Sequence, residues 1–187
     1  MNNTLVTYNK DKLIELIKQR ALKFGEFTLA SGQTAKFYLD CRRLTLSGEG
    51  ANHVAAGMMD LMKDDWPDAV GGMAIGADPI TAAVITVAWQ QNRELTGFIV
   101  RKEAKQHGTG NQVEGPCEPG QRAIILEDVV TTGGSSVRAI EYAREFGLKV
   151  DKVIAIVDRQ AGAREAFEKV GVELQSLVTL SDLGIDS

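Results

Sequence analysis

The sequence has little cysteine, no excess of positive charge and no long apolar run. The two cysteines, Cys41 and Cys117, have no second cysteine or histidine at ligand spacing, which argues against disulfides or a zinc site and fits a reducing cytoplasm. The net charge of −4 predicts no general binding to nucleic acid or a membrane, so an anionic ligand needs a local cluster of cations. The most apolar stretch, residues 80–89, is too short to span a bilayer, and residues 1–12 lack the apolar core of a signal peptide.

What is present is the composition of one globular domain, with 187 residues of which 44% are hydrophobic. From residue 69 onward, apolar and amphipathic stretches alternate. We expect strands at 69–75, 95–101, 123–128, 152–158 and 174–179, and helices at 79–91, 135–146 and 162–170. Because residues 123–126 and 153–157 are apolar throughout, helices should cover both faces of these strands. The expected fold is therefore α/β, a parallel twisted sheet flanked by helices, with ligands beyond the carboxyl ends of the strands.

The first third of the chain has a different pattern. Apolar residues recur at helical spacing over 11–23, and Gly25 is well placed to end that helix. Extended chain is expected over 27–42, around a turn at Ser31 and Gly32. Another helix is expected over 48–62.

The most informative segment begins at the end of the strand at 123–128. Two adjacent carboxylates, Glu127 and Asp128, precede a loop of small and hydroxyl residues and then a helix. The loop contains Val129, Val130, Thr131, Thr132, Gly133, Gly134 and Ser135. Hydroxyl groups, glycines and the free N–H groups of a helix N-terminus suit a phosphate monoester, whereas the carboxylates suit sugar hydroxyls or a Mg²⁺-bound ligand. The pattern thus favours a phosphorylated sugar, and the alternative is a capped strand-to-helix turn with a solvated acidic pair.

Residues 125–136 resemble the phosphoribosyl-diphosphate signature of type I phosphoribosyltransferases: an apolar strand, two acids, two variable residues, threonine and a small-residue turn. The resemblance implies that Glu127 and Asp128 contact the ribose hydroxyls, with Asp128 also serving catalysis. It implies that residues 131–135 hold the 5′-phosphate and that Val129 and Val130 belong to the same binding segment. The chain lacks a P-loop lysine and a G-x-G-x-x-G turn, which disfavours ATPase and dinucleotide-binding functions.

A second segment, residues 101–108, is rich in cations although the chain is acidic overall. Most such runs are solvated charges on exposed loops, but a mobile cationic loop can also neutralise a leaving diphosphate and exclude water. This run closely resembles the catalytic loop of orotate phosphoribosyltransferases. The resemblance implies that Arg101, Lys102, Lys105 and His107 bind diphosphate and that both lysines are catalytic. It also implies that Lys102 reaches the neighbouring subunit's site, so that a homodimer shares its active sites.

Two further segments resemble the same family and concern the base. Residues 27–42 are similar to its N-terminal hood, where aromatic residues flank the base. Asp158 and Arg159 match a pattern in which the arginine pairs with the orotate carboxylate, a bidentate fit for a planar guanidinium. The alternative for Arg159 is a surface ion pair. Thr131 corresponds to a family position that contacts orotate.

Two departures from the family pattern concern the diphosphate. Some members have lysine where Ala30 stands. Others have Tyr-Lys where this chain has Ile75 and Gly76, so we expect that loop to hold diphosphate through backbone N–H groups.

The resemblance covers about residues 13–180. It implies transfer of the phosphoribosyl group from phosphoribosyl diphosphate to orotate in de novo pyrimidine synthesis, with Mg²⁺ bound through substrate oxygens and no direct protein ligand. It implies one domain over residues 1–187, with a hood at about 1–45 plus the C-terminal segment and a core at about 65–160. The alternatives are a phosphoribosyltransferase for another base, which Arg159 disfavours, and a non-catalytic sensor of phosphoribosyl diphosphate, which the absence of a nucleic-acid-binding module disfavours.

Overall fold

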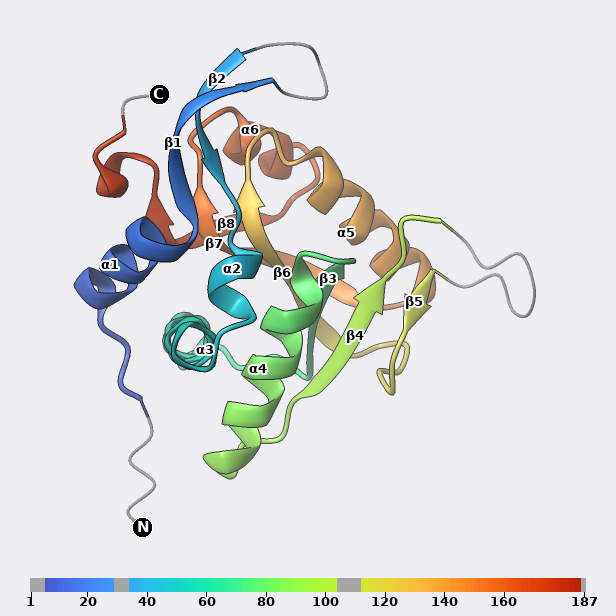
Figure 1. The fold of residues 1–187 in the computed structure, drawn as a ribbon. Coiled ribbons are helices and arrows are strands. Elements are labelled where there is room, and N and C mark those ends of the chain that lie inside the picture. The colour runs from blue at the N-terminus through green and yellow to red at the C-terminus, as the bar shows by residue number, and fades with distance from the viewer. Residues whose placement is uncertain (1–5, 29–33, 104–111, 186–187) are drawn as a thin grey trace.

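The computed structural model describes residues 6–28, 34–103 and 112–185, and its centre is a six-stranded sheet (Figure 1). The strand order is β5-β4-β3-β6-β7-β8. The strands are β3 (Ala69–Met73), β4 (Thr96–Val100), β5 (Val113–Glu114), β6 (Arg122–Val130), β7 (Lys149–Asp158) and β8 (Glu173–Thr179). All neighbours are parallel except β4 and β5, which are antiparallel. The expected α/β fold is confirmed, with a short antiparallel edge strand that the sequence did not predict.

Helices cover both faces of the sheet. The helices α3 (Gly48–Met62) and α4 (Ala77–Gln90) pack on one face, and α5 (Gly134–Phe146) and α6 (Ala163–Glu168) pack on the other (Figure 1). Side chains of β6 alternate between the two cores, since Ile124 and Leu126 join the first and Ile125 the second. This explains why the central strands are apolar at every position. None of the helices in the described ranges is long and apolar enough to cross a membrane.

The N-terminal segment forms helix α1 (Lys10–Arg20) and an antiparallel hairpin of β1 (Leu22–Thr28) and β2 (Thr34–Leu39). The helix ends earlier than expected, and Gly25 does not terminate it. The carbonyl of Ala21 accepts a hydrogen bond from Asp40 N–H at 3.0 Å, which draws the chain into the hairpin. Gly25 instead lies inside β1, where the register is irregular between Phe24 and Phe27.

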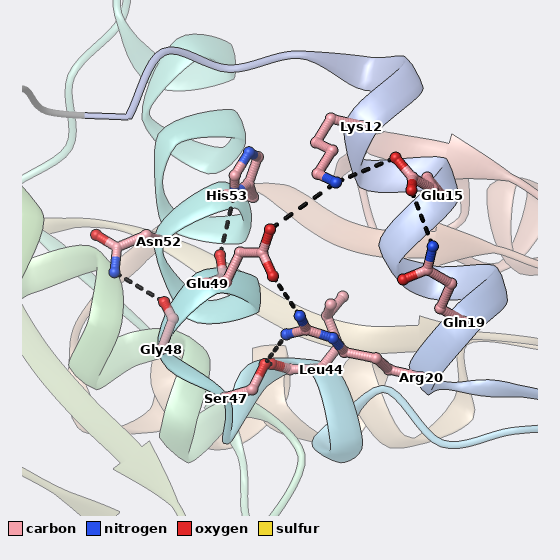
Figure 2. A network of polar contacts seen from close by, with 10 residues as sticks. All are labelled: Lys12, Glu15, Gln19, Arg20, Leu44, Ser47, Gly48, Glu49, Asn52 and His53. Atoms are coloured by element: carbon pink, nitrogen blue, oxygen red, sulfur yellow. Dashed lines mark hydrogen bonds and ion pairs between the residues drawn. The ribbon is translucent and has the colours of Figure 1, made fainter.

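Polar contacts fasten α1 to the elements beside it (Figure 2). Arg20 donates to Ser47 Oγ at 2.7 Å and also pairs with Glu49 at the start of α3. Figure 2 also shows Lys12 between Glu15 and Glu49. Ser47 lies between α3 and the short helix α2 (Arg42–Thr45), which leads out of the hairpin. These contacts fix the end of α1, where the hairpin begins, relative to α3.

The end of the chain packs beside its beginning. A short 3₁₀ helix, η1 (Ser181–Leu183), follows β8. Lys10 forms an ion pair with Asp182 at 2.9 Å, and the Tyr8 hydroxyl donates to the carbonyl of Leu177 at 3.2 Å. The C-terminal segment therefore supports the helix from which the hairpin extends.

Candidate active site

A cavity of ≈ 280 Å³ lies between the hairpin and the carboxyl edge of the sheet. We call it the central cavity. Four parts of the chain line it: the end of the hairpin with α2, the loop after β3, the start of the loop after β4, and the end of β6 with α5. The lining residues used below are Asp40, Arg42, Gly76, Lys102, Glu127, Asp128 and Ser135. Segments that the sequence singled out separately thus meet in one place.

The acidic pair lies within β6, because this strand continues to Val130. Val129 and Val130 were expected in the loop, but they pair with Val157 and Asp158 of β7. Successive side chains of a strand point to opposite faces. Glu127 accordingly contacts α5, while Asp128 lies against Gly76 on the other side.

Glu127 is almost completely buried, with 5% of its surface exposed. Its Oε2 accepts a hydrogen bond from Ser136 Oγ at 2.7 Å, and Ser135 Oγ lies 3.4 Å away. Burial raises the pKa of Glu127 to about 7, the charge of Asp128 adds to this, and the Ser136 hydrogen bond acts in the opposite direction. The two acids of the pair therefore lie in different environments, Glu127 against α5 and Asp128 against the loop after β3.

The loop after β6 has the geometry of a phosphate cradle. Gly133 adopts a left-handed conformation (φ 80°) directly before α5, and a Cβ at this position would lie 3.0 Å from the Phe167 ring. Only glycine fits both conditions. Thr131 and Thr132 precede α5 and Ser135 lies in its first turn, where the first N–H groups of a helix lack partners within the helix.

The loop after β3 approaches the acidic pair through Gly76. A Cβ at Gly76 would lie 2.8 Å from Asp128 Oδ1. The Asp128 carboxylate is also held by the backbone N–H of Val129 at 2.9 Å. Beside this loop, Asp78 Oδ1 is buried without a hydrogen-bond partner among the described residues, and burial raises the pKa of Asp78. Asp78 was not assigned a role from the sequence.

The cationic segment is only partly described. Lys102 lines the central cavity and also a neighbouring cavity of ≈ 520 Å³, which Arg101 lines as well. Arg101 pairs with Glu114 of β5 at 3.0 Å rather than with a residue of the central cavity. Lys105 and His107 lie outside the described residues, as does Ala30.

Arg159 follows β7 and lies against the hairpin. Its guanidinium carbon is 5.0 Å from the centre of the Phe37 ring, and the backbone N–H of Arg159 donates to the carbonyl of Val130 at 2.9 Å. Asp158 is buried and accepts from the N–H of Gln160 at 2.7 Å, so it shapes the turn. In the described part of the chain, the residues lining the central cavity do not include Thr131 or Arg159.

The junction between the hairpin and α2 contributes a charged pair that was not assigned a role from the sequence. Arg42 Nε donates to Asp40 Oδ1 at 2.8 Å, and this hydrogen bond lowers the pKa of Asp40. Over the described ranges, no group of three or more histidine, cysteine, aspartate or glutamate side chains is arranged to hold a metal ion.

Comparison with known proteins places the chain in a family. No family model matches it. The orotate phosphoribosyltransferase of Rhodopirellula baltica is 52% identical over 180 residues, which cover 93% of each chain. The crystal structure of Mycobacterium tuberculosis orotate phosphoribosyltransferase in complex with Fe(III) dicitrate has a TM-score of 0.85 at 36% identity and covers 94% of this chain and 99% of that one. Its complex with 5-phospho-α-D-ribosyl 1-diphosphate has a TM-score of 0.81 at 33% identity, with the same coverage.

A helix-flanked parallel sheet with an acidic pair and a small-residue loop at the end of β6 is the arrangement of the type I phosphoribosyltransferases, and this is the class of the protein. The identity over nearly the whole chain narrows the class further. The chain belongs to the orotate phosphoribosyltransferase family. The resemblance inferred from the motifs is thereby confirmed.

Proposed function

We propose that this protein is an enzyme that transfers the 5-phosphoribosyl group from phosphoribosyl diphosphate to orotate, with formation of orotidine 5′-phosphate and diphosphate. The observation that carries the proposal is the meeting of Glu127, Asp128 and the loop at Gly76 in one cavity beside the phosphate cradle of α5. Such a site offers oxygen acceptors for sugar hydroxyls next to donors for phosphate, as this donor substrate requires.

The sugar phosphate is oriented by β6 and α5. Residues 131–135 bind the 5′-phosphate through hydroxyl groups and the free N–H groups of α5, where the helix dipole favours negative charge. Asp128 and Glu127 accept hydrogen bonds from the ribose hydroxyls. Both contacts fix the anomeric carbon in the central cavity, so positioning supplies much of the rate.

Charge on the departing diphosphate is neutralised by the loops after β3 and β4. The loop at Gly76 supplies backbone N–H groups at the cavity, and Lys102 supplies a cation to the site of the neighbouring subunit. Arg101, Lys105 and His107 act with Lys102 as the leaving group separates from an oxocarbenium-like ribose. Orotate is already an anionic nucleophile, so the reaction needs no strong protein base.

We assign recognition of the base to Arg159, with a further contact from Thr131. A guanidinium forms two parallel hydrogen bonds with a carboxylate, the group that distinguishes orotate from uracil. The Phe37 ring beside Arg159 offers an apolar face for a planar base.

The proposal includes Mg²⁺ as cofactor, bound mainly through substrate oxygens. The carboxylates of Asp128 and Glu127 at the central cavity suit a Mg²⁺-bound ligand, since this ion typically keeps waters and takes few protein ligands. When bound, it offsets the negative charge of the diphosphate. A cytoplasmic location is also proposed, supported by two cysteines that are both free.

The proposal further includes a homodimer with shared sites. In its support, apolar side chains are exposed beside Lys102: Ile75, at 65% exposure, and Ile99 line the neighbouring cavity with it. Co-expression of Lys102→Ala with Asp128→Asn tests the sharing. If Lys102 acts across the interface, mixed dimers regain one intact site and the mixture recovers up to roughly a quarter of wild-type activity, since random pairing makes half of the dimers mixed. Recovery no greater than the sum of the two variants would contradict it.

The enzyme assay contains Mg²⁺, phosphoribosyl diphosphate and orotate and follows the loss of orotate absorbance, with uracil and hypoxanthine as control bases. Turnover with orotate alone is expected. Turnover with hypoxanthine would indicate a transferase for another base. Binding of phosphoribosyl diphosphate by titration calorimetry without turnover of any base would indicate a sensor.

A further inference from the structure

Ser136 lies one residue beyond the phosphate loop and is directed away from it. It is in the first turn of α5 and has 1% of its surface exposed. A buried serine in a helix commonly bonds the carbonyl one turn back. Here the hydroxyl leaves the helix and donates to Glu127 Oε2 on β6 at 2.7 Å. The contact joins the helix that receives the phosphate to the strand that carries the acidic pair.

This hydrogen bond favours one state of Glu127. A buried carboxylate is costly unless donors stabilise its charge. Burial raises the pKa of Glu127 to about 7, and the Ser136 hydroxyl opposes that shift. Without Ser136, a larger fraction of Glu127 is protonated at neutral pH, and the side chain loses the contact that fixes its orientation.

The surroundings of Glu127 offer few substitutes for Ser136. On β7, the register partner of Glu127 is the apolar Ala155. From α5, Ser135 Oγ is farther away, at 3.4 Å. The charged groups that line the central cavity with Glu127, from its own strand, the loop after β4 and the end of the hairpin, are Asp128, Lys102, Asp40 and Arg42.

We propose that Ser136 is a positioning residue for phosphoribosyl diphosphate: its hydroxyl holds the ionised Glu127 carboxylate in the orientation that meets the ribose hydroxyls. This inference rests on the proposed function. On this proposal, α5 acts at both ends of the sugar phosphate. Its N-terminus binds the phosphate, and Ser136 orients the carboxylate that binds the ribose.

The test measures KM for each substrate in Ser136→Ala at pH 7 and pH 9. Loss of a hydrogen bond to a charged group should raise KM for phosphoribosyl diphosphate about tenfold or more at pH 7, with KM for orotate changed less than about twofold. Because loss of the donor raises the pKa of Glu127, the defect should shrink at pH 9, where the carboxylate is ionised in both proteins. A purely structural role would affect both substrates and both pH values alike.

Two further variants complete the design. In a Glu127→Gln background, Ser136→Ala should have little additional effect, since the charge it serves is absent. Ser136→Cys keeps a small side chain with a weaker donor and should give an intermediate KM. It provides the test if the alanine variant does not fold.

The outcomes separate the two proposals. A wild-type protein without orotate turnover defeats the proposed function. The role of Ser136 is overturned by the following result. The wild type is active, but a folded Ser136→Ala or Ser136→Cys variant has the wild-type KM for phosphoribosyl diphosphate and the wild-type calorimetric affinity for that substrate with Mg²⁺.

Discussion

The guanidinium carbon of Arg159 lies 5.0 Å from the centre of the Phe37 ring. The two residues come from different parts of the molecule, since Phe37 is in β2 of the hairpin and Arg159 follows β7 at the edge of the main sheet. A cation over an aromatic face is attracted by the ring quadrupole. The pair therefore links the position of the hairpin to the residue proposed to bind the base.

Replacing Arg159 by lysine keeps the charge but removes the planar pair of donors. The expected result is a KM for orotate raised about 10- to 100-fold, from loss of one charge-assisted hydrogen bond of roughly 1.5–3 kcal/mol. KM for phosphoribosyl diphosphate should stay within about twofold. Arg164→Lys in α6 is the matched control, and an equal effect in both variants would refute the assignment.

The Phe37→Leu variant keeps an apolar side chain but removes the ring. A cation–π contact at an exposed site contributes about 0.5–1 kcal/mol, so KM for orotate should rise about two- to fivefold. Trp89→Leu, which changes a ring of α4 with 72% of its surface exposed, should leave the kinetics unaltered. If Phe37→Leu has no measurable effect, the contact does not contribute to base binding.

Gly76→Ala tests the approach of the loop after β3 to the acidic pair. The new Cβ would lie 2.8 Å from Asp128 Oδ1, so the carboxylate or the loop must move. We expect kcat/KM for phosphoribosyl diphosphate to fall by more than about tenfold, because small displacements at a reacting centre are costly. Gly48→Ala, where the added Cβ meets no atom within 4 Å, is the control. Unchanged kinetics for Gly76→Ala would mean that Asp128 tolerates displacement.

Glu127→Gln tests the burial of charge through stability. The folded-state pKa of Glu127, about 7, lies above its ordinary value of 4.5, so this group's contribution to stability is fully present below 4.5 and is lost as pH rises through about 7. Glutamine carries no charge to bury. The variant should therefore raise Tm relative to wild type at pH 8 and change it little at pH 4.5. Thermal unfolding followed by circular dichroism measures this, with exposed Glu168→Gln as control, and a Tm difference independent of pH would contradict the assignment.

Lys105→Ala tests the cationic loop, for which the sequence motif is the basis. Loss of one key electrostatic group should lower turnover by about 10²–10³-fold. Lys149→Ala, on the exposed start of β7, provides the control. Near-normal turnover in Lys105→Ala would exclude a catalytic role for this lysine.

Much of the fold could be predicted because it depends on long periodic segments. The helix at 48–62 has the expected bounds, and the two apolar strands are buried on both faces as expected. The elements that were missed, α2, β5 and η1, have two to four residues, too few for a period to be visible. The end of α1 was misjudged because a long-range hydrogen bond between Asp40 and Ala21, rather than Gly25, directs the chain there.

Features of the candidate site that lie within one segment could be predicted from the sequence. Features that depend on contact between two segments could not. The loop after β6 was predicted to bind phosphate from its own residues alone. The approach of Gly76 to Asp128 joins two strands, and no local pattern encodes it. The different environments of Glu127 and Asp128 could have been foreseen in part, because neighbouring residues of a strand face opposite sides.

Two contacts hold the N-terminal segment at α1 against the C-terminal segment: the ion pair between Lys10 and Asp182 and the hydrogen bond from Tyr8 to Leu177. Removal of the segment from residue 177 onward takes away both acceptors. The start of the hairpin then loses this support and shifts, and Phe37 shifts with it. Discrimination between bases would decline in such a truncated protein although every residue near the base was still in place.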